Sequence, residues 1–465
     1  MQKKSVYILV YLLPLIYGML YIFVFGTNLI IGDDWNFLDD WFRYKETGDL
    51  WTTLWAPLFG HIEVLPKMVQ YATLPLCHWN VKIVMYEMQL FVFWAYFFFA
   101  KRAEYQCIKT TALEDNKMPI SFVMCSLGLA LVCYSAVHWE NFSWAVNIGI
   151  IMCIAFSVGC FYMFDLYCNT HKIKYLLVSY ALMLAANLCH GTGFAIGVVY
   201  IGMLGVEFLV DRTYKNKENY MSYIGAIVVF AVCIFIYRET LGGGTNFTES
   251  ISYYISYYFV LSGNIFAPGY EFMTPYMYIY AGVIGFIFNI LSLAVLIKMI
   301  RKNEIKKYRF EFLIMAFSVA LRLMILAQRS GIGYVSALYS HYAFYTVLNI
   351  ASLILIMTKE GVGISSFFST SKNQKKQEKA HVSGWMRISY WIVILAFLFY
   401  SIACIYVSYG SKVSRMEKTQ LMLNYDKVDR EELRILGLFV DGDDAFAQIQ
   451  RADKYGLSAF HNKDN

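Results

Sequence analysis

The chain has 465 residues, of which 58% are hydrophobic and 18% aromatic, whereas only 15% are charged. This composition excludes a set of soluble domains, because so apolar a chain cannot be covered by polar surface in water. The net charge of +6 does not indicate a nucleic-acid partner, because the basic residues are concentrated in alternate loops between apolar segments. We therefore expect an integral protein of the cell (cytoplasmic) membrane, surrounded by membrane lipids.

The first apolar stretch, residues 6–31, is too long for the core of a signal peptide and has no small-residue cleavage site. Stretches long enough to span a bilayer recur along the chain. They predict an all-α polytopic membrane protein with about eleven transmembrane helices. The predicted spans are residues 6–31, 81–100, 118–137, 145–167, 175–189, 193–210, 221–237, 276–298, 311–327, 342–358 and 388–409.

The distribution of lysine and arginine predicts the orientation. Lys3 and Lys4 precede the first span, and every second loop after it is basic. By the positive-inside rule these loops and the N-terminus are cytoplasmic. The transmembrane domain covers residues 1–409. On the outer face we then expect an interfacial helical loop at residues 32–80, a second long loop at 238–275 and a small polar C-terminal tail at 410–465.

Two apolar segments need separate treatment in this predicted topology. Residues 251–266 are rich in tyrosine, and making them a span would move the basic cluster at 301–309 outside, so we expect them in the outer interface. Residues 175–210 are interrupted at His190 to Gly193, which fits either two short spans with a tight outer hairpin or one re-entrant hairpin.

Adjacent carboxylates follow the first span in the sequence Gly32-Asp33-Asp34-Trp35. One interpretation is that they cap the following amphipathic helix at the membrane surface, with the tryptophan as an interfacial anchor. The other is catalytic, because burial at the mouth of an apolar cavity raises the pKa of a carboxylate and suits it to accept a proton. Asp40 is farther from the membrane end, and we expect it to tolerate an amide.

The position of these acids resembles the GT-C superfamily of membrane glycosyltransferases, of the uncharacterised bacterial surface-polysaccharide type. Three further segments extend the resemblance: residues 61–66 before the second span, residues 138–141 in the second outer loop, and Ser340-His341-Tyr342 at the start of a late span. His341 stands where related bacterial proteins carry arginine. The resemblance implies a GT-C-like fold and an inverting transfer of a sugar from a polyprenyl-phosphate donor to a glycan or lipid acceptor on the outer face.

The resemblance also assigns roles to individual residues. Asp34 is the expected general base, with Asp33 as the close alternative. The candidates for binding substrate or the leaving phosphate are Arg329, His341, Lys67, His61, Glu63, Glu140 and Arg238. No cofactor is expected, and a divalent metal is not indicated, because no cluster with metal-ligand spacing occurs.

The donor is expected to be lipid-linked for a reason independent of the family. A nucleotide-sugar donor would need a nucleotide-binding site, but the sequence contains neither a phosphate-binding GxxxxGK[ST] loop nor a strand–GxGxxG–helix unit. An activated sugar is therefore expected to reach the protein in the membrane, linked to polyprenyl phosphate.

Two alternative functions stay open. A polysaccharide polymerase or ligase would depend on arginines such as Arg238 in a long outer loop, and a transporter or flippase would use charged residues within the spans, here Glu87, Asp165, Glu207 and Arg322.

Overall fold

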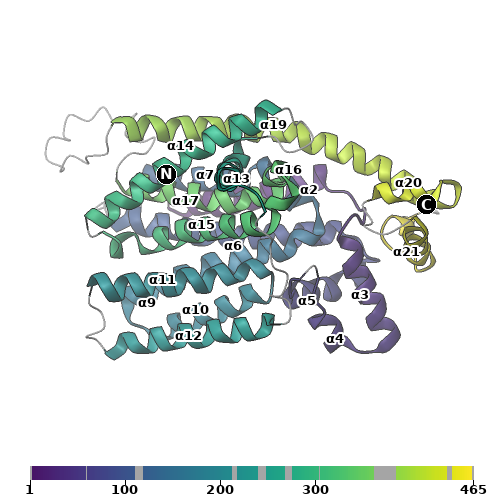
Figure 1. Ribbon diagram of the computed structural model, residues 1–465, viewed down its shortest axis with the longest axis horizontal. Coiled ribbons are helices and arrows are strands. Elements are labelled where there is room, and N and C mark those ends of the chain that lie inside the picture. Colours follow the sequence, from purple (N-terminus) through teal and green to yellow (C-terminus); the bar gives the residue numbers. More distant parts are fainter. Residues whose placement is uncertain are drawn as a thin grey trace.

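The computed structural model describes residues 3–58, 60–109, 119–211, 217–238, 248–267, 275–302, 304–360, 384–436 and 442–462. Over these ranges the protein is built of helices, apart from an isolated bridge between Leu58 and His61. Seven of the described helices are long and apolar enough to span a membrane, and three shorter helices are also apolar. The chain is therefore a multi-pass all-α membrane protein (Figure 1).

Each predicted span falls on a helix of this bundle. The first comprises α1 (Lys3–Tyr7), a π-helical segment (Ile8–Leu12) and α2 (Leu13–Phe25), so it ends six residues earlier than predicted. The others are α6 (Lys82–Lys109), α7 (Ile120–Cys133), α9 (Ile148–Thr170), α10 (Ile173–Asn187), α11 (Phe194–Asp211), α12 (Lys217–Tyr237), α14 (Pro275–Arg301), α15 (Arg309–Arg329), α17 (Ala343–Lys359) and α19 (Gly384–Leu423).

The irregular turn in the first span has a local cause. Pro14 has no N–H group, so it cannot donate to the carbonyl of Val10 four residues earlier. The helix passes through its π-helical segment immediately before this proline. The hydroxyl of Tyr96, on α6, donates to the Val10 carbonyl at 2.6 Å. A neighbouring span thus satisfies the backbone acceptor that the proline leaves free.

The tyrosine-rich segment forms α13 (Ile251–Gly263), which packs closely against α14. A Cβ atom at Gly263 would lie 1.9 Å from the Ala281 carbonyl oxygen, and one at Gly285 would lie 1.9 Å from the Phe259 carbonyl oxygen. Only glycine permits this approach of two backbones. Tyr253, on α13, also donates to the Ser330 carbonyl at 2.7 Å, just beyond the end of α15.

The segment 175–210 forms two helices, α10 and α11, joined by a short turn at Gly191–Gly193. A Cβ atom at Gly193 would lie 2.7 Å from Asn187 Cα, so the turn is too tight for a larger residue. The two-helix interpretation of this stretch therefore matches its secondary structure.

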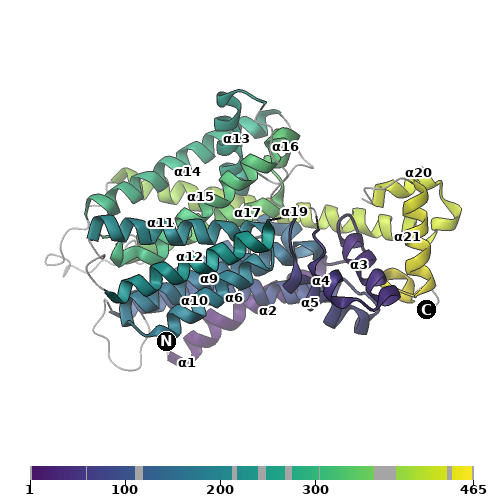
Figure 2. The same ribbon diagram turned by 60° about the horizontal axis from the view of Figure 1, so that its bottom comes forward.

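Residues 410–423 continue α19 beyond the predicted end of the transmembrane domain. In both views α19 runs along the bundle and leads to α20 (Arg430–Leu433) and α21 (Gly442–Lys454), beside the first loop with α3 (Asp34–Thr47), α4 (Leu50–Trp55) and α5 (Val64–Thr73) (Figures 1 and 2). The C-terminal unit, described over residues 425–436 and 442–462, contacts this loop directly.

Backbone and ring contacts join the two parts. The Leu436 carbonyl accepts from Gly32 N at 3.3 Å, and the His78 carbonyl accepts from Ser458 N at 2.7 Å. The rings of His78 and His461 stack with centroids 3.7 Å apart. The C-terminal residues are thus packed against the loop that carries the paired acids.

Candidate functional site

A cavity of about 550 Å³ lies at the end of the bundle where α15 ends and α17 begins. Polar and aromatic side chains from loops and helix ends far apart in the sequence converge on it. They are Asp33, His61, Glu63, Glu140, Trp144, Asn147, His190, Gln328, Arg329, Tyr339, His341 and Tyr342. Six of the nine candidate residues from the sequence are among them, and Asp34, Lys67 and Arg238 are not.

The paired acids point in different directions. Gly32 adopts a positive φ of 52°, and Asp33 occupies the N-cap position of α3. Asp33 lines the cavity, where burial raises the pKa of its carboxyl while the charges of Arg329 and His341 oppose this rise. Asp34 lies one residue further, which on a helix is a rotation of about 100°.

That rotation buries Asp34 in the protein, where only 4% of the residue is exposed. Its carboxylate accepts from Ile31 N at 3.5 Å. Burial raises the pKa of Asp34 to about 7, and the amides of Ile31 and Val146 and the charge of Arg415 act in the opposite direction. The structure therefore presents Asp33, and not Asp34, to the cavity.

Glu140 and His341 form the best-connected part of the site. Glu140 lies in the short helix α8 (Trp139–Ser143), and His341 in the 3-10 turn Ser340–Tyr342 that precedes α17. One carboxylate oxygen, Oε2, accepts from Ser340 Oγ at 2.9 Å and from His341 N at 3.0 Å, and lies 3.0 Å from His341 Nδ1. Asn141 adds a bond to the His341 carbonyl at 3.0 Å.

These contacts join two motifs that sequence reasoning treated separately. Because Nδ1 of His341 is held by Glu140, Nε2 is the ring nitrogen without a hydrogen-bond partner in the described part of the chain. It is therefore the nitrogen available to a ligand.

Glu63 and two histidines form another wall of the cavity. Glu63 is only 5% exposed, and its Oε2 atom has no hydrogen-bond partner among the described residues. Burial raises the pKa of Glu63 to about 8, with the charge of Lys67 opposing and that of Asp33 adding to this shift. The rings of His61 and His190 are in contact, with centroids 4.1 Å apart and planes tilted by 37°. Burial lowers the pKa of His61 to about 4 and that of His190 well below its usual range.

Arg329 is the last residue of α15 and is half-buried at the cavity. The 3-10 turn Ser330–Ile332 follows directly, and it ends at Gly333, which adopts a positive φ of 98°. Among the described residues no carboxylate forms an ion pair with the Arg329 guanidinium, although Asp33 lies close enough to be influenced by its charge. Arg329 is thus a cation available to an anionic ligand.

Lys67 is buried away from the cavity. Its ammonium donates to Asp40 Oδ2 at 2.7 Å and to the carbonyls of Thr53 and Ala56 at 2.9 and 2.7 Å. All three of its hydrogens are therefore engaged in holding α3, α4 and α5 together. Arg238 follows α12, is exposed, and lies with its guanidinium 4.3 Å from the Phe235 ring centroid.

Sequence reasoning did not include several cavity residues in the site. His190, which lies in the break between two apolar stretches, is interpreted from the sequence as a hydrogen-bonded interfacial histidine and is not among the candidate residues. Trp144, Asn147, Tyr339 and Tyr342 lie beside motifs that were singled out. A polar break between two short spans is the one signal that could have identified His190, since such a break must lie at a membrane face or line a cavity.

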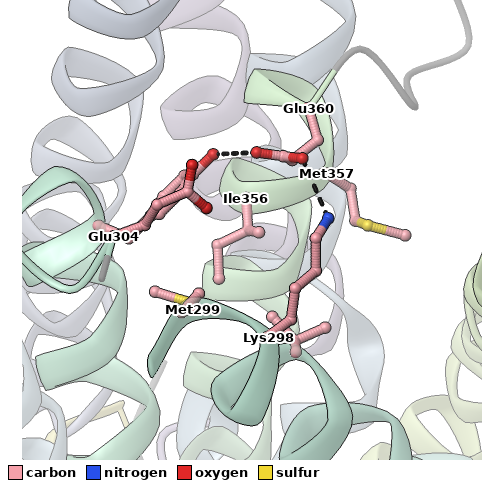
Figure 3. Close-up of a pocket in the computed structure, with 8 residues that line it drawn as sticks. Lys298, Met299, Glu304, Ile356, Met357 and Glu360 are labelled. Carbon is pink, nitrogen blue, oxygen red and sulfur yellow. Dashed lines mark hydrogen bonds and ion pairs between the residues drawn. The ribbon is translucent and has the colours of Figure 1, made fainter. Parts of the chain in front are cut away.

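A second hollow lies at the opposite ends of α15 and α17 and is filled by its own side chains (Figure 3). Glu360 accepts from Lys298 at 3.1 Å and from the Tyr308 hydroxyl, and Lys307 lies 3.6 Å from it. The free volume is about 10 Å³, close to the minimum for one water. This hollow has no room for an organic ligand.

The comparisons with known proteins do not add a family to this picture. No model of a known protein family matches the chain, and no curated protein matches it either. Among the described residues no group of three or more histidine, cysteine, aspartate or glutamate side chains has an arrangement that could hold a metal ion.

Proposed function

We propose that this chain is a membrane glycosyltransferase that moves a sugar from a polyprenyl phosphate to a hydroxyl of a glycan or lipid acceptor. The observation that supports this most is the gathering of Asp33, Glu140, Arg329 and His341 around one cavity. A carboxylate with a raised pKa can accept the hydroxyl proton, and the Arg329 guanidinium, which has no carboxylate partner among the described residues, can hold the phosphate. In this proposal the cavity opens on the extracytoplasmic face of the cell membrane.

The proposed reaction is a single displacement with inversion. The proton of the acceptor hydroxyl passes to Asp33 as its oxygen forms a bond to the anomeric carbon. The bond from that carbon to the phosphate oxygen breaks, and its electron pair leaves with the polyprenyl phosphate. Arg329, with Nε2–H of His341 when that ring carries its second proton, stabilises the charge that develops on the phosphate.

The choice of Asp33 changes the expectation from sequence, which favoured Asp34. Asp34 is buried behind the cavity wall and is held by backbone amides, so it is poorly placed to reach an acceptor. In this scheme it supports the turn that presents Asp33.

The two alternative functions are less well supported by the geometry. The arginine expected of a polymerase, Arg238, does not line the cavity. Two of the four charged span residues expected of a transporter form buried ion pairs: Arg102 bridges Asp165 and Glu311 at 2.9 and 2.6 Å, and Arg309 pairs with Glu207. Arg322 donates instead to the neutral Ser262 Oγ at 2.6 Å, and Glu87 has a carboxylate oxygen without a hydrogen-bond partner among the described residues. Separating such buried pairs costs about 3–5 kcal/mol each, which opposes an alternating movement at that end of the bundle.

The test is transfer by the purified protein in detergent. A panel of polyprenyl-phosphate-linked sugars is supplied with a polysaccharide acceptor, and parallel reactions contain nucleotide sugars without any lipid donor. We expect product only with a lipid-linked donor. Turnover of a nucleotide sugar alone would contradict the proposal, and so would the absence of transfer from the whole panel by protein shown to be folded.

A further inference from the structure

Among the described residues, the carboxyl group of Glu63 at the cavity has neither a hydrogen-bond partner nor an ion-pair partner. Glu140 is bonded to His341, and Asp33 lies within the influence of Arg329 and His341. Glu63 lines the same cavity with a buried Oε2 atom that has no hydrogen-bond partner among the described residues. An unpaired polar atom in such a place costs roughly 1–3 kcal/mol, which a ligand that donates to it can recover.

Within the described part of the chain no cation forms an ion pair with Glu63. The charge of Lys67 acts on Glu63, but the Lys67 ammonium is saturated by Asp40 and two carbonyls. His61 and His190, on the same wall, are held neutral by burial, which lowers the pKa of both rings. A Cβ atom at Gly149 would lie 3.1 Å from Glu63 Oε2, so no protein side chain can enter from that position without displacement.

The cavity brings a cation and two carboxyl groups together. Asp33, Glu63 and Arg329 all line it. Burial raises the pKa of both carboxyl groups; the charge of Arg329 opposes this rise at Asp33, and the charge of Asp33 adds to it at Glu63. The charge of Arg329 also acts on His61 and His190, on the same wall as Glu63. A phosphate held by Arg329 would place the sugar among these groups, within the influence of both carboxyl groups.

We propose that the Glu63 end of the cavity binds an ammonium group, and hence that the sugar handled here is an amino sugar. The assignment of the sugar to this end depends on the proposed function, whereas the ammonium site itself is independent of it. A primary ammonium in the cavity can donate to the carboxylates of Glu63 and Asp33, both of which line it. A neutral hydroxyl would leave Glu63 protonated and would form no ion pair with it.

Proton release distinguishes this site from a hydroxyl site. Below its pKa of about 8 Glu63 carries a proton in the empty cavity. An ammonium ligand favours the carboxylate, so its binding at pH 6 should expel close to one proton. The other titratable groups that influence or face Glu63 are Asp33, Lys67, His61, His190, Cys153, Cys189 and Tyr237.

The experiment is calorimetric binding to the full-length protein in detergent. The probes are 2-amino-, 3-amino- and 4-amino-deoxyglucose, with glucose as the neutral reference, titrated at pH 6 in two buffers of different ionisation enthalpy. We expect at least one amine to bind about tenfold more tightly than glucose, as a charge-assisted hydrogen bond implies, with proton release. Glu63→Gln should abolish both the preference and the release. Glu417→Gln, a change at an exposed glutamate of α19, should alter neither.

Three results would overturn the ammonium site: equal affinity for all four probes, an amine preference without proton release, or a preference that survives in Glu63→Gln. The wild-type proton count decides the matter even if the variant does not fold. Transfer of a neutral sugar by a protein without amine preference would refute this inference and leave the proposed function standing.

Discussion

Glu140 Oε2 lies 3.0 Å from His341 Nδ1, and these two residues are 201 positions apart in the chain. The same oxygen accepts from the His341 backbone amide and from Ser340 Oγ. The carboxylate thereby sets both the position of the turn before α17 and the orientation of the His341 imidazole, a ring that lines the cavity.

We expect Glu140→Gln to reduce transfer roughly tenfold to a hundredfold, in the range seen when a group that orients a functional histidine is lost. The amide keeps an acceptor oxygen but not the charge that fixes the ring. The ¹⁵N chemical shifts of His341 should report a changed tautomer balance in the same variant. An unchanged spectrum and unchanged transfer would leave Glu140 a purely structural residue.

Asp33→Asn should reduce transfer about a hundredfold or more, because an amide cannot accept the proton of the acceptor. Asp34→Asn should keep most of the activity, since Asp34 lies outside the cavity. Initial rates of the two variants, at matched amounts of folded protein, make the comparison. The opposite ranking would return the general base to Asp34.

Arg329→Ala should reduce transfer by about two orders of magnitude, the usual cost of removing one group that stabilises a transition state. Arg329→Lys should restore part of this, because a point charge cannot make the two-pronged contact of a guanidinium with a phosphate. The change should appear in kcat. Equal rates for the alanine variant and the wild type would exclude contact with the leaving group.

Asp40→Asn should destabilise the protein by roughly 3–5 kcal/mol, because it leaves the ammonium of Lys67 buried without its counter-charge. This expectation replaces the mild effect predicted from the position of Asp40 in the sequence. The double change Asp40→Asn with Lys67→Met should recover part of the loss. Thermal unfolding in detergent measures the stability of both variants. A melting temperature of Asp40→Asn equal to that of the wild type would contradict the importance of this pair.

Stability should fall as the pH rises from about 6.5 to 8.5. The folded protein holds protons on Asp34 and Glu63, whose pKa values are raised to about 7 and about 8, whereas the unfolded chain has already released them. The depressed pKa of His61 acts only below pH 6.5, where it destabilises the protein as the pH falls. Glu63→Gln should flatten the decline of the melting temperature above pH 6.5. A decline as steep as in wild type would locate its origin elsewhere.

The sequence by itself determined the class of the protein and the positions of its helices. Every predicted span falls on a helix, because a segment that crosses the bilayer must satisfy its backbone hydrogen bonds internally and so reveals itself as a continuous apolar stretch. The alternation of basic loops also predicts that residues 33, 61, 140, 190, 329 and 341 lie on the same side of the membrane. In the structure these six residues line one cavity.

Only the tertiary structure decided which residues of those segments face the cavity. Asp33 and Asp34 are adjacent residues of the same type, so the sequence does not distinguish them. One step along the helix turns the Asp34 side chain away from the cavity and buries it in the protein. Lys67 is drawn into a buried ion pair with Asp40, and the polar C-terminal residues dock on the first loop instead of forming a separate tail. These outcomes depend on contacts between residues tens to hundreds of positions apart, and no local pattern of hydropathy or charge encodes such contacts.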